Sequence, residues 1–483
     1  MTWGKIPVRE IRERQGRKLH QFISKKVYPY SPRYRRLFDE HGIKPDHIRS
    51  IEDLRKIPFT SKADIVPSEE DPNRYRDIIL QPSPEQLRDD LTLTDKIALW
   101  AKSKVFLRSI QDQVLDEYLP VHITFTTGRS SLPTPFVYSK HDLEIMRVAG
   151  KRMFQVAGLD RKHDRGLNAM PFAPHLAFWQ VVYAAEHVGL MILHSGGGKV
   201  MPSEAIIKIG ERTSPTFMLG TPGYIMHLAN LAVEGGYKLD SFKKVILGAE
   251  RVSDEYKEKL KTLLAKVGSP GVQIHNVYGF TEAKHAWMET ADAPDSRFTT
   301  YPDLEIFEVI DPDTGEPVPE GEPGEVVYTH LAGSGSILLR YRTGDRVRDG
   351  LVYDRCPHTG LILPLLGTRL DRVSEIKKVK GTLVDFNEMF SFFNGKKEII
   401  DWQVVVSRPQ GQEFGRDIIT LRVTLECEVD SEEFRQAICA EFKTVTEIAL
   451  DEVEFYSRKE LSEKLGLDTQ AKESRIVDER PKD

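Results

Sequence analysis

The sequence predicts an α/β fold: a large N-terminal domain with parallel βαβ sheets and a β-rich subdomain, then a small α+β C-terminal domain. Three observations predict it. The chain has 483 residues, of which 40% are hydrophobic and 29% charged, as in soluble globular proteins of two or three domains. Short apolar runs alternate with amphipathic segments over residues 187–277. Turn-rich segments separate further strand-like runs after residue 300.

The N-terminal region is predicted to be helical. Its first 65 residues read as helices with breaks at Tyr30–Pro32 and Gly42–Pro45, and a further helical stretch covers about Thr94–Tyr118. The opening residues mix basic and acidic side chains without an apolar core segment, so they do not resemble a secretory signal. The longest apolar stretch, about Pro171–Leu193, is interrupted by polar residues and predicts a buried helix rather than a membrane span.

Parallel βαβ units are predicted in the middle of the chain. The clearest helix there begins after Ser253, a good N-cap, and ends at Gly268. Because crossovers between parallel strands are right-handed, the loops after neighbouring strands share one sheet edge, which should bring Gly248–Glu250 near Tyr278–Glu282. The expected strands are Gly189–Leu193, Thr216–Leu219, Val245–Leu247 and Val272–Val277.

The last third of the chain predicts a hairpin and then a separate domain. An acidic, turn-rich segment, Asp311–Gly324, leads into a strand at Glu325–His330. Charge density rises near Gly367–Lys380, and beyond it lie two strand-like runs and one amphipathic helix. We therefore expect a large N-terminal domain over residues 1–370 and a small C-terminal domain over residues 371–483.

Charge and cysteine content exclude several classes of protein. The net charge is -5, from 68 basic and 73 acidic side chains, too balanced for an extended nucleic-acid or membrane surface. The three cysteines, Cys356, Cys427 and Cys439, show no C-x-x-C spacing, which favours a reducing compartment, by default the cytoplasm. Cys356 and His358 lack a second pair of ligands for a metal site.

Two runs about sixty residues apart each end in a carboxylate after a glycine: Val277–Glu282 and Arg340–Asp345. Both acids are expected on loops at strand ends, where ligands bind in open α/β sheets. A third segment, Thr124–Ser131, combines hydroxyls, a glycine and Arg129, which suit phosphate oxygens. The alternatives are a helix-capping glutamate for Glu282, a turn aspartate for Asp345 and a surface turn for Thr124–Ser131.

The chain resembles the adenylate-forming (acyl-CoA synthetase) superfamily, and within it the phenylacetate–CoA ligase family. The resemblance lies in the three segments just described and in Tyr34–Leu37, Ile48–Leu54 and Ile57–Lys62. The resemblance covers nearly the whole chain. It implies that residues 1–370 form an N-terminal adenylation (AMP-binding) domain and that residues 371–483 form a mobile C-terminal domain. It implies an AMP-forming carboxylate–CoA ligase that uses ATP, Mg²⁺ and coenzyme A, with a small carboxylic acid as substrate. It also implies the reaction order: an acyl-adenylate forms first and a thioester second.

The resemblance also implies residue roles. The residues implied to be catalytic are Lys472, near the α-phosphate and carboxylate, Glu282, as the magnesium ligand, and Thr126. Those implied to bind the nucleotide are Thr126, Thr127, Gly128, Arg129, Gly248, Ala249, Glu250, Tyr278, Gly279, Thr281, Asp345, at the ribose hydroxyls, and Arg369. Asp371 is implied to be the hinge of the C-terminal domain. Lys472 lies in a charged tail, where a lysine is otherwise simply solvated.

An aromatic acid is the expected substrate, because the predicted pocket is rich in aromatic residues. Its expected lining is Phe172, His175, Phe178, Trp179, Thr221 and Pro222. Packing of Phe178 and Trp179 in the core is the alternative.

The phosphate segment departs from the family pattern. Phe125 stands where the family has glycine, and Arg129 where it has lysine. Two alternatives therefore stay open beside CoA ligation: an adenylate-forming enzyme that uses another acceptor or transfers AMP to a cofactor, and a nucleotide-binding protein without catalysis. Dimers are the general expectation for such a chain.

Overall fold

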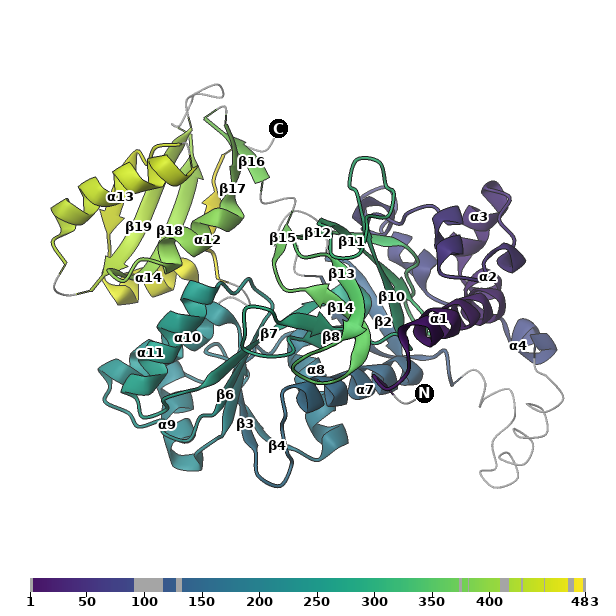
Figure 1. Ribbon diagram of the computed structural model, residues 1–483, viewed down its shortest axis with the longest axis horizontal. Coiled ribbons are helices and arrows are strands. Elements are labelled where there is room, and N and C mark those ends of the chain that lie inside the picture. Colours follow the sequence, from purple (N-terminus) through teal and green to yellow (C-terminus); the bar gives the residue numbers. More distant parts are fainter. Residues whose placement is uncertain are drawn as a thin grey trace. The chain divides into compact units, whose positions relative to one another are not determined.

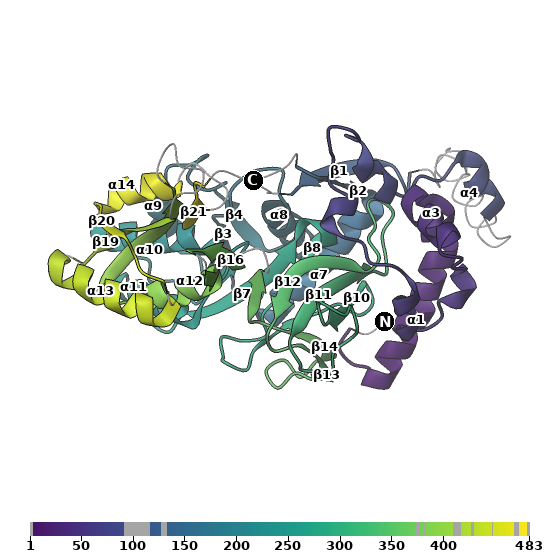
Figure 2. The ribbon, with the colours of Figure 1, turned by 90° about the horizontal axis from the view of Figure 1, so that it is seen from above.

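The computed structural model describes residues 3–90, 116–126, 133–372, 376–380, 382–408, 417–426, 429–446, 448–467 and 473–480 (Figures 1 and 2). The chain divides into two compact units. Unit 1 comprises Met1–Asp160, Pro174–Leu190 and Val277–Leu370. Unit 2 comprises Arg161–Ala173, Met191–Asn276 and Asp371–Asp483. One of the divisions falls between Leu370 and Asp371, and the predicted mobile C-terminal domain stays a prediction.

Unit 1 begins with helices, as predicted. Ser31 interrupts them and caps the helix that follows, because its Oγ accepts the backbone N–H of Tyr34 at 3.4 Å. Leu19, Tyr34 and Phe38 are fully buried in the core that these helices form. The helices are α1 (Val8–Phe22), α2 (Tyr28–Tyr30), α3 (Pro32–Glu40) and α4 (Pro84–Asp90). Of the predicted helix at Thr94–Tyr118, residues 94–115 lie outside the described residues.

The rest of unit 1 combines strands with two packed helices. Strands β1 (Pro120–Phe125) and β2 (Pro135–Ser139) pair antiparallel and lead into α7 (Lys140–Val156), which packs on α8 (Leu176–Val188). Helix α8 lies within the stretch predicted to be a buried helix. The predicted hairpin is confirmed, since β10 (Glu305–Ile310) pairs antiparallel with β11 (Gly324–His330). The other strands are β8 (His285–Met288), β9 (Arg297–Thr299), β12 (Tyr341–Val347), β13 (Leu351–Arg355) and β14 (Ile362–Gly367).

Unit 2 contains the predicted parallel βαβ sheet. Its strands run in the order β4-β3-β5-β6 and pair parallel. Ser253 caps α11 by accepting the N–H of Tyr256 at 3.2 Å, and Leu260 and Leu264 are buried on its inner face. Strand β7 (Gln273–Phe280) starts here and continues into unit 1. The other elements are β3 (Arg165–Asn168), β4 (Met191–His194), β5 (Phe217–Gly220), β6 (Lys244–Gly248), α9 (Ser203–Thr213), α10 (Pro222–Glu234) and α11 (Asp254–Lys266).

The α+β region predicted at the C-terminus is also present in unit 2. Its four-stranded sheet has the order β20-β19-β18-β21, with Trp402 and Val404 in its core. Helices α12 and α13 contact each other, while α14 lies against β18 and β19 (Figures 1 and 2). Strand β15 (Leu370–Arg372) precedes this region and belongs to the sheet of order β10-β11-β12-β15. The elements of the α+β region are β16 (Ile376–Val379), β17 (Thr382–Asp385), α12 (Phe386–Asn394), β18 (Ile399–Ser407), β19 (Ile418–Leu425), α13 (Ser431–Thr446), β20 (Glu452–Phe455), α14 (Arg458–Leu465) and β21 (Ile476–Asp478).

The fold class is therefore as predicted, a mixed α/β fold with a C-terminal α+β region. None of the helices in the described part of the chain is long and apolar enough to cross a membrane.

Candidate functional site

The two acid-bearing runs are joined reciprocally in unit 1. The hydroxyl of Tyr278, in the first run, donates to Oδ2 of Asp345, in the second, at 2.8 Å. The hydroxyl of Tyr341, in the second run, donates to Oε1 of Glu282, in the first, at 3.0 Å. Each carboxylate is thus oriented by a tyrosine of the other run, and the structure brings the two predicted acids together as one assembly.

Local backbone geometry sets where these acids stand. Glu282 lies in a 3₁₀ turn, Thr281–Ala283, directly after β7. Asp345 follows Gly344, whose φ of 74° is the left-handed conformation that glycine adopts without strain. An ideal Cβ on Gly279 would lie 2.6 Å from Cβ of Ala286 on β8, so glycine is required where β7 and β8 pair.

The ring of Tyr278 lies among other aromatic side chains. Its centroid is 5.6 Å from that of Phe280, 5.5 Å from that of Trp287 and 5.7 Å from that of Phe298. Because its hydroxyl is bonded to Asp345, the ring is fixed at both its edge and its tip. Such a ring offers a rigid aromatic surface beside a carboxylate.

Only the base of the predicted phosphate loop is described. Thr126 and Thr134 close it, because the N–H of Thr126 donates to the carbonyl of Thr134 at 3.1 Å and the N–H of Thr134 donates to Thr126 Oγ1 at 3.0 Å. The predicted residues Thr127, Gly128 and Arg129 lie outside the described residues.

The backbone of Phe125, the residue that departs from the family pattern, is tied to the start of α8. Its N–H donates to the carbonyl of Pro174 at 2.8 Å, and its carbonyl accepts Nδ1 of His175 at 3.2 Å. Both hydrogen bonds are made by the main chain of Phe125 and not by its phenyl side chain. His175, predicted to line the acid pocket, thus also braces the strand that enters the phosphate loop.

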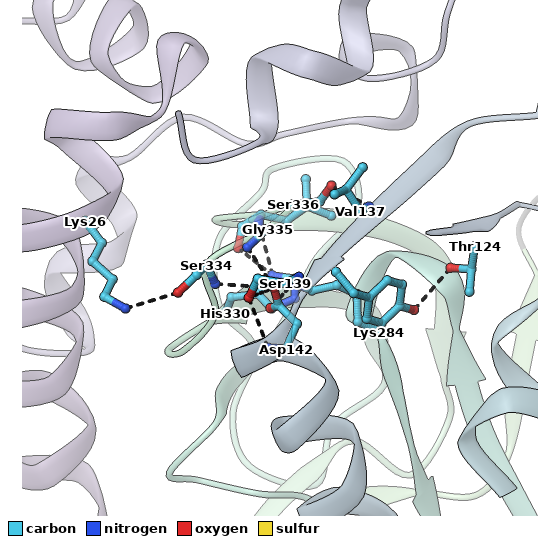
Figure 3. Close-up of polar contacts among 12 residues, drawn as sticks. Lys26, Thr124, Val137, Ser139, Asp142, Lys284, His330, Ser334, Gly335 and Ser336 are labelled. Carbon is cyan, nitrogen blue, oxygen red and sulfur yellow. Dashed lines mark hydrogen bonds and ion pairs between the residues drawn. The ribbon is translucent and has the colours of Figure 1, made fainter. Parts of the chain in front are cut away.

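A buried ion pair anchors the chain next to Glu282 (Figure 3). Lys284, at a φ of 67°, pairs with Asp142 in the first turn of α7, and their side chains are only 4% and 1% exposed. Asp142 also accepts the N–H of Ser139 at 2.9 Å and that of Gly335 at 2.7 Å. Burial raises the pKa of Asp142, but the ammonium of Lys284 and these hydrogen bonds outweigh it and keep that pKa below its usual value.

A buried tyrosine connects this anchor to the strand that leads to Thr126. The hydroxyl of Tyr138 lies 3.1 Å from Thr124 Oγ1 on β1, and the ammonium of Lys284 lies 5.7 Å from the centroid of its ring. Burial raises the pKa of Tyr138 well above its usual value, and the negative charges of Asp142 and Glu282 add to the shift.

Two of the residues predicted to line the acid pocket belong to an aromatic cluster in unit 1. Trp179 makes an edge contact with His122 at 5.1 Å between centroids and with Phe178 at 5.7 Å. His122 also contacts Tyr138 and Tyr183. Burial lowers the pKa of His122, so the cluster is apolar and uncharged at neutral pH. Phe172 belongs to unit 2, where it is 54% exposed.

Unit 2 carries the other predicted loops at the carboxyl ends of its parallel strands. Thr221 and Pro222 follow β5 and begin α10. Gly248 ends β6, Ala249 has a φ of 71°, and Glu250 accepts the backbone N–H of Glu473 through Oε1 at 3.1 Å. The expected proximity of Gly248–Glu250 to Tyr278–Glu282 stays a prediction.

Arg369, predicted to bind the nucleotide, and Asp371, the predicted hinge, are both engaged in ion pairs. Arg369 binds Asp349 through Nε at 2.8 Å, and its side chain is 70% exposed. Asp371, in unit 2, pairs with Arg251 at 2.9 Å and is 9% exposed. Lys472 lies outside the described residues, and Glu473, the next residue, is the first described one after it.

Four residues that support the predicted site were not assigned a role from the sequence: Tyr138, Asp142, Lys284 and Tyr341. Tyr341 stands inside the second run, so its proximity to Asp345 was a usable signal. Lys284 and Asp142 are 142 residues apart, and nothing local in the sequence pairs them. Within the described residues, no group of three or more histidine, cysteine or acidic side chains is arranged to hold a metal ion.

Comparison with known proteins shows which proteins this chain is similar to. Residues 59–333 match the family of AMP-binding enzymes. The phenylacetate-coenzyme A ligase of Thermus thermophilus is 26% identical over 409 residues, which span 84% of this chain and 80% of that protein. The phenylacetate-coenzyme A ligase of Pseudomonas putida is 27% identical over 345 residues, 70% of this chain and 66% of that protein. A solved 2-hydroxyisobutyryl-CoA ligase in complex with 2-HIB-AMP shares the fold, with a TM-score of 0.74 at 20% identity over 98% of this chain and 91% of that one.

Proposed function

The chain belongs to the family of AMP-binding enzymes, whose match covers more than half of it, and from this premise we propose that it is an ATP-dependent carboxylic acid–CoA ligase. The observation that carries the proposal is the reciprocal pair of tyrosine–carboxylate hydrogen bonds, Tyr278 to Asp345 and Tyr341 to Glu282. It makes one rigid assembly from the two runs that the family resemblance links to nucleotide and magnesium.

The proposed reaction has two steps. A carboxylate oxygen of the acid attacks the α-phosphorus of ATP, the bond to the β-phosphate breaks, and pyrophosphate leaves with an acyl-adenylate formed. The sulfur of CoA then attacks the acyl carbon, the bond to the AMP oxygen breaks, and the thiol proton passes to solvent. No protein nucleophile takes part, so the protein acts by positioning and by electrostatic stabilisation.

In unit 1 we propose the nucleotide roles that the resemblance implies, and the geometry of the two runs supports them. Asp345 accepts the ribose hydroxyls, since a carboxylate has lone pairs left after the hydrogen bond from Tyr278. The ring of Tyr278 provides the surface for adenine, and Gly279 and Thr281 bring backbone and hydroxyl groups beside it. Thr126, with Thr127, Gly128 and Arg129, binds the phosphates.

Glu282 fits the requirements of a magnesium ligand. Its Oε1 accepts Tyr341, and none of the residues that the structure describes donates to Oε2. A carboxylate oxygen available in this way is the hard ligand that Mg²⁺ binds. Bound there, the ion would neutralise charge on the triphosphate. Tyr341 holds the carboxylate in orientation, and the Lys284–Asp142 pair holds the backbone next to it.

We propose an aromatic acid as substrate. The aromatic cluster around Trp179 supports this, as do the relatives, which are phenylacetate-coenzyme A ligases. In unit 2, Thr221 and Pro222 contribute to the acid pocket and Gly248–Glu250 to the nucleotide site. Lys472 approaches the α-phosphate, and the region after Asp371 turns between the two half-reactions.

ATP–pyrophosphate exchange tests the proposal. With phenylacetate, benzoate and aliphatic acids supplied in turn, exchange is expected with an aryl or arylalkyl acid, and adding CoA should then yield the thioester and AMP. Exchange without thioester formation would favour a different acyl acceptor or transfer of AMP to a cofactor. No exchange with any acid, while ATP still binds, would favour a nucleotide-binding protein without catalysis.

A cytoplasmic homodimer is the expected form of such an enzyme. Light scattering coupled to size-exclusion chromatography measures its mass, and fractionation of cells measures its location.

A further inference from the structure

The segment around Thr60 lies beside the start of β12, within unit 1. The N–H of Thr60 donates to the carbonyl of Arg340 at 2.9 Å, and its carbonyl accepts the N–H of Arg342 at 2.9 Å. These two bonds form a parallel bridge between Thr60 and Tyr341. Tyr341 is 2% exposed, and its hydroxyl is the group that orients Glu282. Both peptide groups that flank Tyr341 are therefore fixed by one residue of the N-terminal region.

The side chain of Thr60 closes a buried ring of hydrogen bonds with Tyr34 and Leu339. Thr60 Oγ1 donates to the carbonyl of Leu339 at 3.0 Å, and the N–H of Leu339 donates to the hydroxyl of Tyr34 at 2.6 Å. The two hydroxyl oxygens lie 3.2 Å apart. Because the only hydroxyl proton of Thr60 goes to Leu339, Tyr34 is the donor of this third bond. All three residues are fully buried, so removal of one hydroxyl leaves a buried partner unsatisfied.

The residue before Tyr341 is held in a conformation that costs free energy. Arg340 has a φ of 45°, in the left-handed region that residues other than glycine rarely adopt. It is 3% exposed, and its Nη1 donates to the carbonyl of Ile57 at 3.0 Å. Its Cζ lies 4.0 Å from the centroid of the Phe59 ring, a favourable cation–π contact. The segment Ile57–Thr60 thus stabilises the strained residue that precedes Tyr341 on the chain.

We propose that Thr60 is a positioning residue for the magnesium site, an inference that rests on the proposed function. Thr60 fixes the backbone on both sides of Tyr341, and Tyr341 orients the carboxylate of Glu282 that we assign to the metal. Since Thr60 is fully buried, it acts only through Tyr341. The alternative is that Thr60 merely stabilises unit 1. The two differ in whether the metal's contribution to nucleotide binding changes when the Thr60 hydroxyl is removed.

Thr60→Val tests the proposal, because valine keeps the shape of the side chain and removes the hydroxyl. Isothermal titration calorimetry measures the Kd of α,β-methylene-ATP, whose α–β bridge is not cleaved, with Mg²⁺ and with EDTA. The ratio of the two Kd values gives the contribution of the metal to binding. This ratio should fall by roughly 3-fold in Thr60→Val, less than the roughly 5-fold expected when the hydrogen bond to Glu282 is itself deleted in Tyr341→Phe.

A rescue variant and a double variant sharpen this test. Thr60→Ser restores the hydroxyl and should restore the wild-type ratio. Thr60→Val combined with Tyr341→Phe should be no worse than Tyr341→Phe alone, because both changes act through one contact. In ATP–pyrophosphate exchange with phenylacetate, the magnesium concentration that gives half the maximal rate should rise in Thr60→Val by the same factor as the Kd ratio falls.

Thr300→Val is the matched control. Thr300 is 2% exposed in unit 1, and its Oγ1 also donates to a main-chain carbonyl, that of Pro364, at 2.6 Å. Neither residue belongs to the two acid-bearing runs. Thr300→Val should lower the melting temperature as Thr60→Val does, since both lose a buried hydrogen bond of the same kind. It should leave the Kd ratio unchanged.

An unchanged Kd ratio in Thr60→Val would overturn the positioning role, as would an equal fall in Thr300→Val or multiplicative effects in the double variant. If Thr60→Val does not fold, Tyr34→Phe opens the same ring of hydrogen bonds and is judged by the same ratio. A wild type that binds the analogue equally well with Mg²⁺ and with EDTA would remove the metal site and the positioning role together. Absence of exchange with every acid would count against the ligase, and the Kd ratio would still decide the role of Thr60.

Discussion

The acids of unit 1 and those of unit 2 are held in different ways. In unit 1, Glu282 and Asp345 each accept a tyrosine hydroxyl from the other run. In unit 2, Glu250 accepts a backbone N–H from Glu473, and the buried side chain of Glu473 accepts Nε of Arg475. The difference indicates a preformed platform in unit 1, made of the runs Val277–Glu282 and Arg340–Asp345, in which neutral hydroxyl groups orient the acids. In unit 2 the main chain and a guanidinium hold them.

The stability of unit 1 should be most sensitive to substitution of Lys284. Lys284→Met leaves Asp142 buried without its counter-ion, which should lower the free energy of unfolding by about 3–5 kcal/mol. Chemical denaturation measures the loss. Lys284→Met combined with Asp142→Asn should recover part of it, because the uncompensated charge is then gone. A single variant as stable as the wild type would mean that this ion pair does not support the platform.

Glu282→Gln tests whether the platform also carries the chemistry. The amide keeps the size of the side chain and can still accept the Tyr341 hydroxyl, but it removes the negative charge assigned to magnesium. Adenylation should fall by about 100- to 1,000-fold, the usual effect of removing one electrostatic contact to the transition state.

The matched control for Glu282→Gln is Glu322→Gln, the same change at an exposed residue of unit 1, which should leave the rate unchanged. Full activity of Glu282→Gln across magnesium concentrations would remove Glu282 from the metal site.

Removal of one tyrosine hydroxyl should have a smaller effect. Tyr278→Phe deletes the hydrogen bond to Asp345 and should raise the KM for ATP about 5-fold, in line with the roughly 1 kcal/mol that such a bond contributes. The KM for the acid should not change. Tyr341→Phe is the counterpart: it releases Glu282 and should change the magnesium dependence instead. Equal effects of both variants on every substrate would show that the pairs act only on stability.

The sequence predicts the helices and strands that have local signals, but it does not predict the contacts between residues that are distant along the chain. The strands of unit 2 and the capped helix after Ser253 were predicted because apolar runs, caps and glycines are local features. Glu282 and Asp345 were recognised from the motifs around them. Their tyrosine partners are 59 and 67 residues away, and only the folded chain reveals them.

The same limit applies to Lys284, Phe125 and Glu473. Phe125 departs from the family pattern in sequence, yet its described hydrogen bonds are made by the main chain, which no side-chain pattern can report. Glu473 is 223 residues from Glu250. For these residues the physical reason is burial: the free energy of the contact comes from a low-dielectric surrounding that many distant segments build together.

The smallest expected effect concerns the pH dependence of stability and a lysine of unit 2 that joins α11 to the C-terminal region. Lys259, on α11, donates to the carbonyls of Ile399 and Ile400, the latter at 3.1 Å. Burial lowers its pKa to about 8, with Asp401 and Glu426 opposing the shift and Arg475 adding to it. An unfolded lysine titrates near its usual value of 10.5, so between the two pKa values the unfolded chain binds more protons. The contribution of Lys259 to stability must therefore rise with pH across that window.

Comparison of the wild type with Lys259→Met isolates the contribution of Lys259 to the pH dependence of stability, because the two proteins share every other titrating group. The melting temperature of the wild type minus that of the variant should increase from pH 7.5 to pH 9.5, by about 1–3 °C for a shift of this size in a large chain. Lys266→Met on the same helix serves as the control and should leave the difference flat, because Lys266 is exposed in the last turn of α11. A difference that falls as pH rises would mean that Lys259 is stabilised as the cation, and unit 2 would then be held as firmly as unit 1.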